Sequence, residues 1–241
     1  MARVDYEIIG FAVLSEKRIK EGGIMSNAER AEMSAKFYRQ YHPAAGPGVY
    51  VADVVGIADE VFPDFPVLGH EYFFADVMSR GGLSIRERNM IIIAVLQAIQ
   101  FSGTKGHMRY AIQIGTSREE AVQVIMHAAP VAGWPVGDEF FSLIEEVYPG
   151  FLKADREESL ESIRSRNLLS ARERSMISMA ALLTRRFYRR LEAEICHALD
   201  IGISRGEILE LILQATPFAG WPAGVGAISV ARDAFSLRER R

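Results

Sequence analysis

The chain has 241 residues, of which 49% are hydrophobic and 24% are charged, and its formal net charge is −3. This composition is typical of a globular protein with a sizeable core and excludes a disordered or low-complexity chain. A net charge this close to zero gives no general attraction to nucleic acid or to an anionic membrane, so neither is expected as a partner.

Cysteine content and hydropathy limit the protein further. Cys196 is the single cysteine, which excludes an intrachain disulfide and a CxxC redox or zinc pair. No apolar run reaches the roughly 18–20 residues that span a bilayer. The apolar stretch 8–14 follows Asp5 and Glu7 and precedes a charged run, so it is a poor signal peptide. We expect a reduced, cytoplasmic protein.

Helices are predicted ahead of the most regular part of the sequence. Residues 1–24 fit no helix or strand pattern. A helix is predicted over 28–41, a loop with proline and glycine over 42–48, and a helix pair over 51–61 and 67–80. We assign residues 1–80 to an N-terminal arm with leading helices.

An internal repeat organises the rest of the chain. The matching blocks are 83–88 with 169–174, 114–120 with 201–207, and 131–135 with 218–222. They occur in the same order at offsets of 86 or 87 residues. This pattern indicates two copies of one helical unit, which we place at 81–150 and 151–241.

Each copy contains two Ser-x-x-Glu motifs with the spacing of a helix capping box. The motifs begin at Ser84, Ser117, Ser170 and Ser204 and precede apolar runs at 90–99, 122–126, 176–183 and 208–213. In such a box the serine oxygen accepts from the N3 amide, and the glutamate accepts from the N-cap amide. Glu87 and Glu173 are therefore interpreted as caps rather than as catalytic acids.

Proline and glycine predict where the helices of each copy end. Pro130 and Pro217 cannot donate the helical hydrogen bond, so the second helix of each copy is expected to end near them. Further helices are expected after each Gly-Trp-Pro, over 136–147 and 223–235. The run 90–99 is apolar almost all round and is expected to form a buried helix. The predicted fold class is all-α.

Five motifs of the first copy carry a family resemblance. They are Arg86-x-Arg88-Asn89-Met90-Ile91-x-Ile93-Ala94, His107-Met108-Arg109-x-Ala111, Gly115-Thr116-Ser117-Arg118-Glu119-Glu120, Val124-Ile125-Met126-His127-Ala128 and Ala132-Gly133-Trp134-Pro135. With these motifs the chain resembles the carboxymuconolactone decarboxylase family, and residues 169–235 look like a second, more divergent copy. The resemblance implies two tandem alkylhydroperoxidase-D-like helical repeats. Because family members build rings from single copies, it also implies a homo-oligomer in which three chains form a pseudo-hexameric ring.

Departures from the family pattern separate its branches. The thiol peroxidase branch has a CxxC pair before the helix histidine, and the corresponding positions, Gln100 and Gly103, carry no thiol. A dithiol cycle needs both thiols, so peroxidase activity of that type is excluded. The decarboxylase branch lacks the pair and keeps histidines that match His107 and His127. The carboxylates that it usually carries before the helix histidine are missing from 101–106.

The two matching histidines are the candidate catalytic residues. His107 is expected near a helix N-terminus, which disfavours the imidazolium and suits a general base. His127 lies on an apolar helix, where it orients His107, protonates an enolate carbon, or is a core histidine without a catalytic role. The second copy has Glu194 and Gln214 at these positions. We therefore expect one pocket, built by the first copy around both histidines, and no equivalent site in the second copy.

Four further residues are candidates for substrate binding. Lys105 lies on a polar loop, where it meets a substrate carboxylate or is a solvated lysine. Trp134, Tyr72 and Phe73 are candidate apolar walls of the pocket, with corner or core packing as the alternative. Four arginines between residues 185 and 190 suit either carboxylate recognition or a solvated or subunit-contacting face. No histidine or cysteine spacing points to a metal site.

Together these features predict a cofactor-independent lyase that acts on a small acidic or enolisable molecule. The resemblance implies decarboxylation of a lactone acid, with His107 as general base or acid and His127 as its partner. Two alternatives stay open. One is a binding or assembly protein of the same fold that has lost its chemistry, and the other is a family fold recruited to cyclisation or rearrangement of a biosynthetic intermediate.

Overall fold

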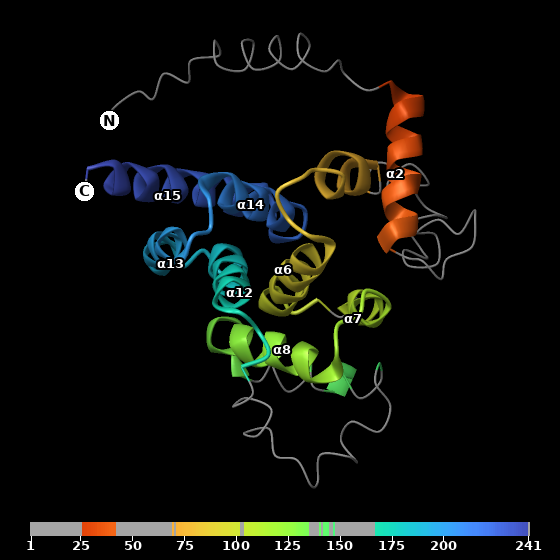
Figure 1. Cartoon of the computed structure of the whole chain (residues 1–241), viewed down its shortest axis with the longest axis horizontal. Coiled ribbons are helices and arrows are strands. Elements are labelled where there is room, and N and C mark those ends of the chain that lie inside the picture. The colour runs from red at the N-terminus through yellow and green to blue at the C-terminus, as the bar shows by residue number, and fades with distance from the viewer. Residues whose placement is uncertain are drawn as a thin grey trace, which may run out of the picture.

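The computed structural model describes residues 26–41, 69, 71–101, 104–134, 140, 142–144, 147 and 167–240 (Figure 1). Every regular element within these residues is a helix, which confirms the all-α fold. The expected loop at 42–48, the expected helix at 51–61 and residues 1–24 lie outside the described residues, as does most of the helix expected at 136–147. In the part of the chain that is described, no helix is both long and apolar enough to cross a membrane.

Two series of helices follow a pair of leading elements. The leading elements are α2 (Asn27–Tyr41) and a π-helical segment, η1 (Tyr72–Met78). The first copy contributes α6 (Ile85–Ala98), α7 (Thr104–Gln113) and α8 (Arg118–Ala132). The second copy contributes α12 (Ala171–Thr184), α13 (Tyr188–Asp200), α14 (Arg205–Ala219) and α15 (Trp221–Glu239). The equivalent helices are α6 with α12, α7 with α13, and α8 with α14.

All four predicted capping boxes are present. In each, the serine side chain accepts from the N3 amide, and the glutamate accepts from the serine amide. The helices α6, α8, α12 and α14 begin directly after these serines. The local sequence thus sets the start of each of these helices, and the capping roles of Glu87 and Glu173 are confirmed.

The second helix of each copy ends near its proline, as expected, two residues beyond it. Pro130 and Pro217 lie inside the last turn of α8 and α14. A proline removes one hydrogen bond, but the N–H groups after it still reach carbonyls of the preceding turn. Gly133 and Gly220 end the two helices, with φ of 111° and 88°, a conformation that favours glycine.

The two copies pack through their first helices at the centre of the molecule (Figure 1). Arg86 on α6 binds Glu173 on α12 at 3.0 Å, and Arg172 on α12 binds Glu87 on α6 at 2.7 Å. The last turns of α6 and α12 also lie close together: the guanidinium of Arg185, at the end of α12, is 3.5 Å from the carbonyl oxygen of Ala98, at the end of α6. Since both ends are paired, α6 and α12 lie side by side and point the same way, related by an approximate two-fold axis.

One hydrophobic cluster spans the two copies. Apolar residues of α6, including Ile91 and Ile93, belong to the same buried cluster as Ile177 and Leu183 of α12. The expectation that the run 90–99 is a buried helix is confirmed as far as residue 98, and Ile99 is exposed. On opposite sides of this central pair, α8 packs against α12 and α14 packs against α6. We call the contact of α8 with α12 the first junction and the contact of α14 with α6 the second junction. The repeat makes the two junctions equivalent.

Candidate active site

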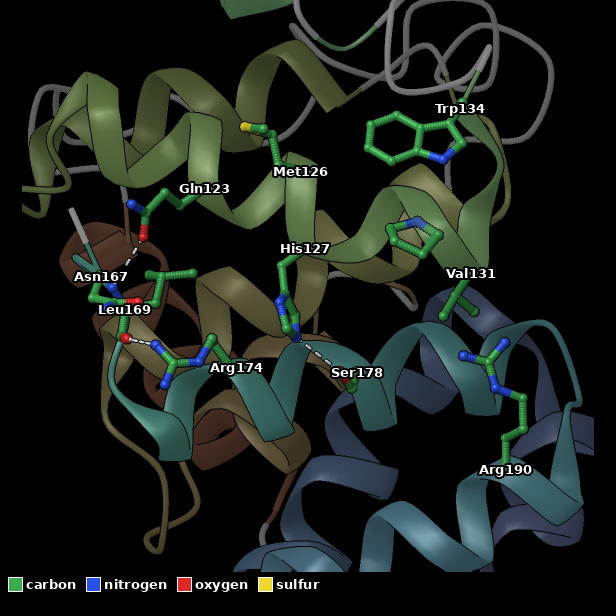
Figure 2. A pocket seen from close by; sticks show the side chains of 11 residues that line it. Gln123, Met126, His127, Val131, Trp134, Asn167, Leu169, Arg174, Ser178 and Arg190 are labelled. Atoms are coloured by element: carbon green, nitrogen blue, oxygen red, sulfur yellow. Dashed lines mark hydrogen bonds between the residues drawn. The ribbon is translucent and has the colours of Figure 1, made fainter. Parts of the chain in front are cut away.

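A cavity of about 390 Å³ opens at the first junction (Figure 2). The first copy lines it with Gln123, Met126, His127, Pro130, Val131 and Trp134, and the second copy with Asn167, Leu169, Arg174, Ser178 and Arg190. The residues of α8 recur at intervals of three or four, so one stripe of this helix forms a wall. The first copy thus supplies one wall of the pocket, as expected, and α12 and α13 of the second copy supply the opposite wall.

His127 lies in the middle of this cavity. Its Nε2 is 2.9 Å from Oγ of Ser178, in a hydrogen bond whose direction follows the tautomer of the imidazole. The side chain is half-buried, and burial is the largest factor that lowers the pKa of His127 below its usual value. A hydrogen bond to the backbone of Arg174 raises the pKa, the positive charge of Arg174 lowers it, and the carboxylate of Glu194 raises it. Because burial has the largest effect, the neutral imidazole is favoured, while the opposite charges of Arg174 and Glu194 act on it in opposite directions.

Two arginines stand at opposite ends of the cavity, with His127 between them (Figure 2). A guanidinium nitrogen of Arg174 donates to the backbone carbonyl of Leu169. Arg190 is exposed, and its guanidinium makes no hydrogen bond or ion pair with the described residues. A guanidinium in this state can bind a carboxylate through two parallel hydrogen bonds.

The other candidate residues are distributed between the cavity and the core. Trp134 lines the cavity and is 55% exposed. Tyr72 and Phe73 do not line it; they belong to an apolar cluster of η1, α2 and α6. The side chain of Lys105 lies outside the described residues.

His107 lies at the second junction and does not line the cavity. Its ring packs edge-on against Phe218 of α14, with 5.7 Å between the centroids. Phe218 also packs edge-on against Phe73, at 5.2 Å. The first junction has the smaller Val131 at the position of Phe218. The structure therefore separates the two candidate histidines instead of placing them in one cavity.

The rest of the second junction is filled by buried side chains. Gln214, the counterpart of His127, is fully buried, and its Oε1 accepts a hydrogen bond of 2.6 Å from Nη1 of Arg88. Arg88 is 1% exposed and also donates to the carbonyl oxygens of Arg80 and Gly81, at 2.7 and 3.2 Å. Ile92, the counterpart of Ser178, is fully buried as well.

The comparison with known proteins agrees with this architecture. The model of the carboxymuconolactone decarboxylase family matches residues 68–146 and, a second time, residues 149–233. The chain belongs to this family. Its two matches are the two tandem copies, so the cavity with His127 lies where one copy of the carboxymuconolactone decarboxylase fold meets the other.

One relative within the family has a described activity. The 4-carboxymuconolactone decarboxylase of Acinetobacter baylyi (strain ATCC 33305 / BD413 / ADP1) is 29% identical over 86 residues. The match covers 35% of this chain and 64% of the length of that relative.

Sequence reasoning missed several residues of the site, among them Arg174 and Ser178, and the neighbouring Glu194. Arg174 belongs to a repeated motif that pointed only to the family, and Glu194 stood out only as a lost histidine. The one available signal was that the second copy has Ser178 where the first has Ile92, which places a hydroxyl within the apolar run 176–183. Among the described residues, no three His, Cys, Asp or Glu side chains gather where they could hold a metal ion.

Proposed function

We propose that the cavity at the first junction is the acid–base site of a decarboxylase-like lyase, which acts on a small acidic or enolisable organic molecule of the lactone acid type. The observation that carries this proposal is the position of His127, which lines the cavity with its Nε2 at 2.9 Å from Oγ of Ser178. Membership in the carboxymuconolactone decarboxylase family and the relative described as a decarboxylase support the choice of reaction.

The proposed reaction divides the work between arginine and histidine. Arg190 binds a carboxylate at one end of the cavity, and Met126, Val131 and Trp134 cover the apolar part of the molecule. The bond between the departing carboxylate and its carbon breaks, carbon dioxide leaves, and the electron pair stays on that carbon as an enolate. The imidazolium of His127 then gives its proton to the carbon and is protonated again from solvent.

The low pKa of His127 suits this proton transfer. Burial makes the imidazolium a stronger acid than it is in water, so it gives up its proton more readily. The proposal assigns the acid–base role to His127 and not to His107, because His107 lies against Phe218 at the other junction. Trp134 keeps its proposed role as a wall of the substrate site.

The test is a substrate screen followed by a comparison of variants. Lactone and aromatic acids are screened by thermal shift, and those that bind are assayed for release of carbon dioxide. In His127→Gln, which carries the residue of the second copy, kcat is expected to fall by about 10²–10⁴-fold with little change in ligand affinity. His197→Gln is the matched control, because His197 is an exposed histidine of α13 that does not line the cavity. Full turnover by His127→Gln overturns the proposal.

The same assay distinguishes the two alternatives. The guanidinium of Arg190, which has no partner in the described part of the chain, can bind an anion whether or not chemistry follows. Ligand binding with no turnover therefore identifies a binding protein, and turnover without carbon dioxide identifies a cyclisation or rearrangement of the bound molecule.

Assembly into a trimeric, pseudo-hexameric ring also stays a proposal. Large apolar side chains are exposed around a cavity of about 260 Å³ between α14 and α15, namely Leu209, Trp221, Val225 and Ile228. Exposed apolar surface of this kind is often covered by a protein partner. Light scattering at micromolar concentration is expected to show three chains, and a strict monomer contradicts the proposal.

A further inference from the structure

Glu194 lies next to the proposed active site on α13, one helical turn after Arg190. Its Oε1 accepts a hydrogen bond of 2.6 Å from Oγ of Ser175 on α12. Ser175 is followed one turn later by Ser178, which binds His127. The carboxylate is thus held on the side of α12 that faces the imidazole.

The charges around His127 come from the second copy. Arg174 on α12 brings a positive charge toward the imidazole, and Glu194 brings a negative charge. Arg190 is the other charged residue that lines the cavity. The carboxylate of Glu194 is the one acidic group among the described residues that acts on His127.

The remaining charged residues on helices packed against α8 lie elsewhere. In the first turn of α6, Arg86 binds Glu120 and Glu173. Glu87 binds Arg172, and Arg88 binds Gln214. The third helix in contact with α8 is α7, which carries Lys105, His107 and Arg109. No acidic residue of α7 opposes His127, because α7 contains none.

We propose that Glu194 is a positioning residue of this site, whose carboxylate, fixed by Ser175, offsets the charge of Arg174 and stabilises the imidazolium of His127. The proposal rests on the acid–base function of His127 proposed above. It reverses the interpretation of Glu194 as a mere loss of histidine. Where the first copy has His107, the second copy has a carboxylate, and this carboxylate acts on the imidazole of the first copy.

The proposal is tested by NMR titration of the His127 imidazole in the full chain without ligand. The chain has five histidines, and loss of one signal in His127→Gln assigns the resonance. In Glu194→Gln the midpoint of the His127 titration is expected to fall by about half a pH unit or more, because an opposite charge nearby has been removed. Glu194→Asp, which keeps the charge, is expected to restore most of the midpoint. An unchanged midpoint in Glu194→Gln overturns the proposal.

Two variants protect this result from trivial explanations. Glu192→Gln makes the same chemical change on the opposite side of α13 and is expected to leave the midpoint unchanged. An equal shift in this control means a general charge effect and contradicts the proposal.

Ser175→Ala keeps the carboxylate but removes its hydrogen bond, so a smaller fall of the midpoint is expected. If Glu194→Gln does not fold, an unchanged midpoint in Ser175→Ala overturns the proposal instead.

Kinetics separate this inference from the proposed function. With an identified substrate, Glu194→Gln is expected to move the pH profile of kcat to lower pH with KM unchanged. The NMR titration needs no substrate, so it tests Glu194 even where His127→Gln shows that the cavity is not catalytic.

Discussion

The first and second junctions share one backbone frame and differ in a few side chains. Both have capped helices, a glycine corner after the second helix and an arginine from the repeated motif. At the first junction His127, Val131 and Ser178 border a cavity. At the second junction their counterparts Gln214, Phe218 and Ile92 fill the space.

The difference shows how little sequence change separates a site from a core. A valine leaves room where a phenylalanine meets its neighbours edge-on. Arg174 borders an open cavity, where an arginine can bind a ligand. Its counterpart Arg88 lies among buried acceptors and stabilises the fold. The type of residue at a motif position therefore does not decide its role; the residues that face it across the junction do.

The arginine of the second junction offers the largest expected effect. Arg88→Ala leaves Gln214 and two backbone carbonyls without their buried donor, and we expect a loss of about 3 kcal/mol or more in the free energy of unfolding. Arg174→Ala at the first junction is expected to cost about 1 kcal/mol, because that side chain borders a cavity. Denaturant unfolding of both variants measures this asymmetry, and equal losses contradict it.

Exchange of Val131 and Phe218 tests what keeps one junction open. Phe218→Val leaves a void in the second junction and is expected to lower the free energy of unfolding by about 2 kcal/mol. Val131→Phe fills the first cavity and is expected to weaken ligand binding by about tenfold or more with less change in stability. Calorimetric titration of a ligand from the substrate screen measures the change in affinity of Val131→Phe. Retained affinity in this variant argues against this cavity as the binding site.

A pH dependence of the stability is expected from His127 at the first junction. The folded protein lowers the pKa of His127 from the usual 6.5, so it binds the proton less well than the unfolded chain does. The resulting stability is complete above pH 6.5 and is lost as pH falls through the lower, folded-state pKa. Unfolding of His127→Gln is expected to lack this decrease below pH 6.5. A wild-type curve that stays parallel to that of the variant contradicts the expectation.

The smallest effect is expected where the two halves are most alike. Arg86 and Arg172 each bind one carboxylate in the other copy and one in their own, Glu120 or Glu207. Because both arginines are partly exposed, Arg86→Ala and Arg172→Ala are each expected to cost about 0.5–1 kcal/mol. Matching losses confirm the approximate two-fold relation, and a loss confined to one variant breaks it.

The sequence predicted the repeat, the helices and their caps because these depend on neighbours three or four residues apart. Ser84 and Glu87 form their box whatever surrounds them. The ends of α8 and α14 were predicted to within two residues, because Pro130 and Pro217 each remove one hydrogen bond without stopping the helix, which ends only at Gly133 or Gly220.

The site was only partly predictable, because it depends on which faces meet. His127 and Trp134 were identified, but the partner of His127 is Ser178, 51 residues further along the chain. The pairing of α8 with α12 rather than with its own α7 around the cavity cannot be read from periodicity. The same helix pairing places His107 at the second junction. The family motifs had instead predicted that both imidazoles lie in one pocket.

The reciprocal pairing of Arg86 with Glu173 and Arg172 with Glu87 has an evolutionary consequence. If two identical chains met in this way, any substitution at a junction would appear twice, and filling one cavity would fill both. Fusion of the copies into one polypeptide removes that constraint, since each half mutates separately while the stoichiometry stays one to one. The covalent link between the halves is thus what allows one junction to be sealed for stability while the other remains open.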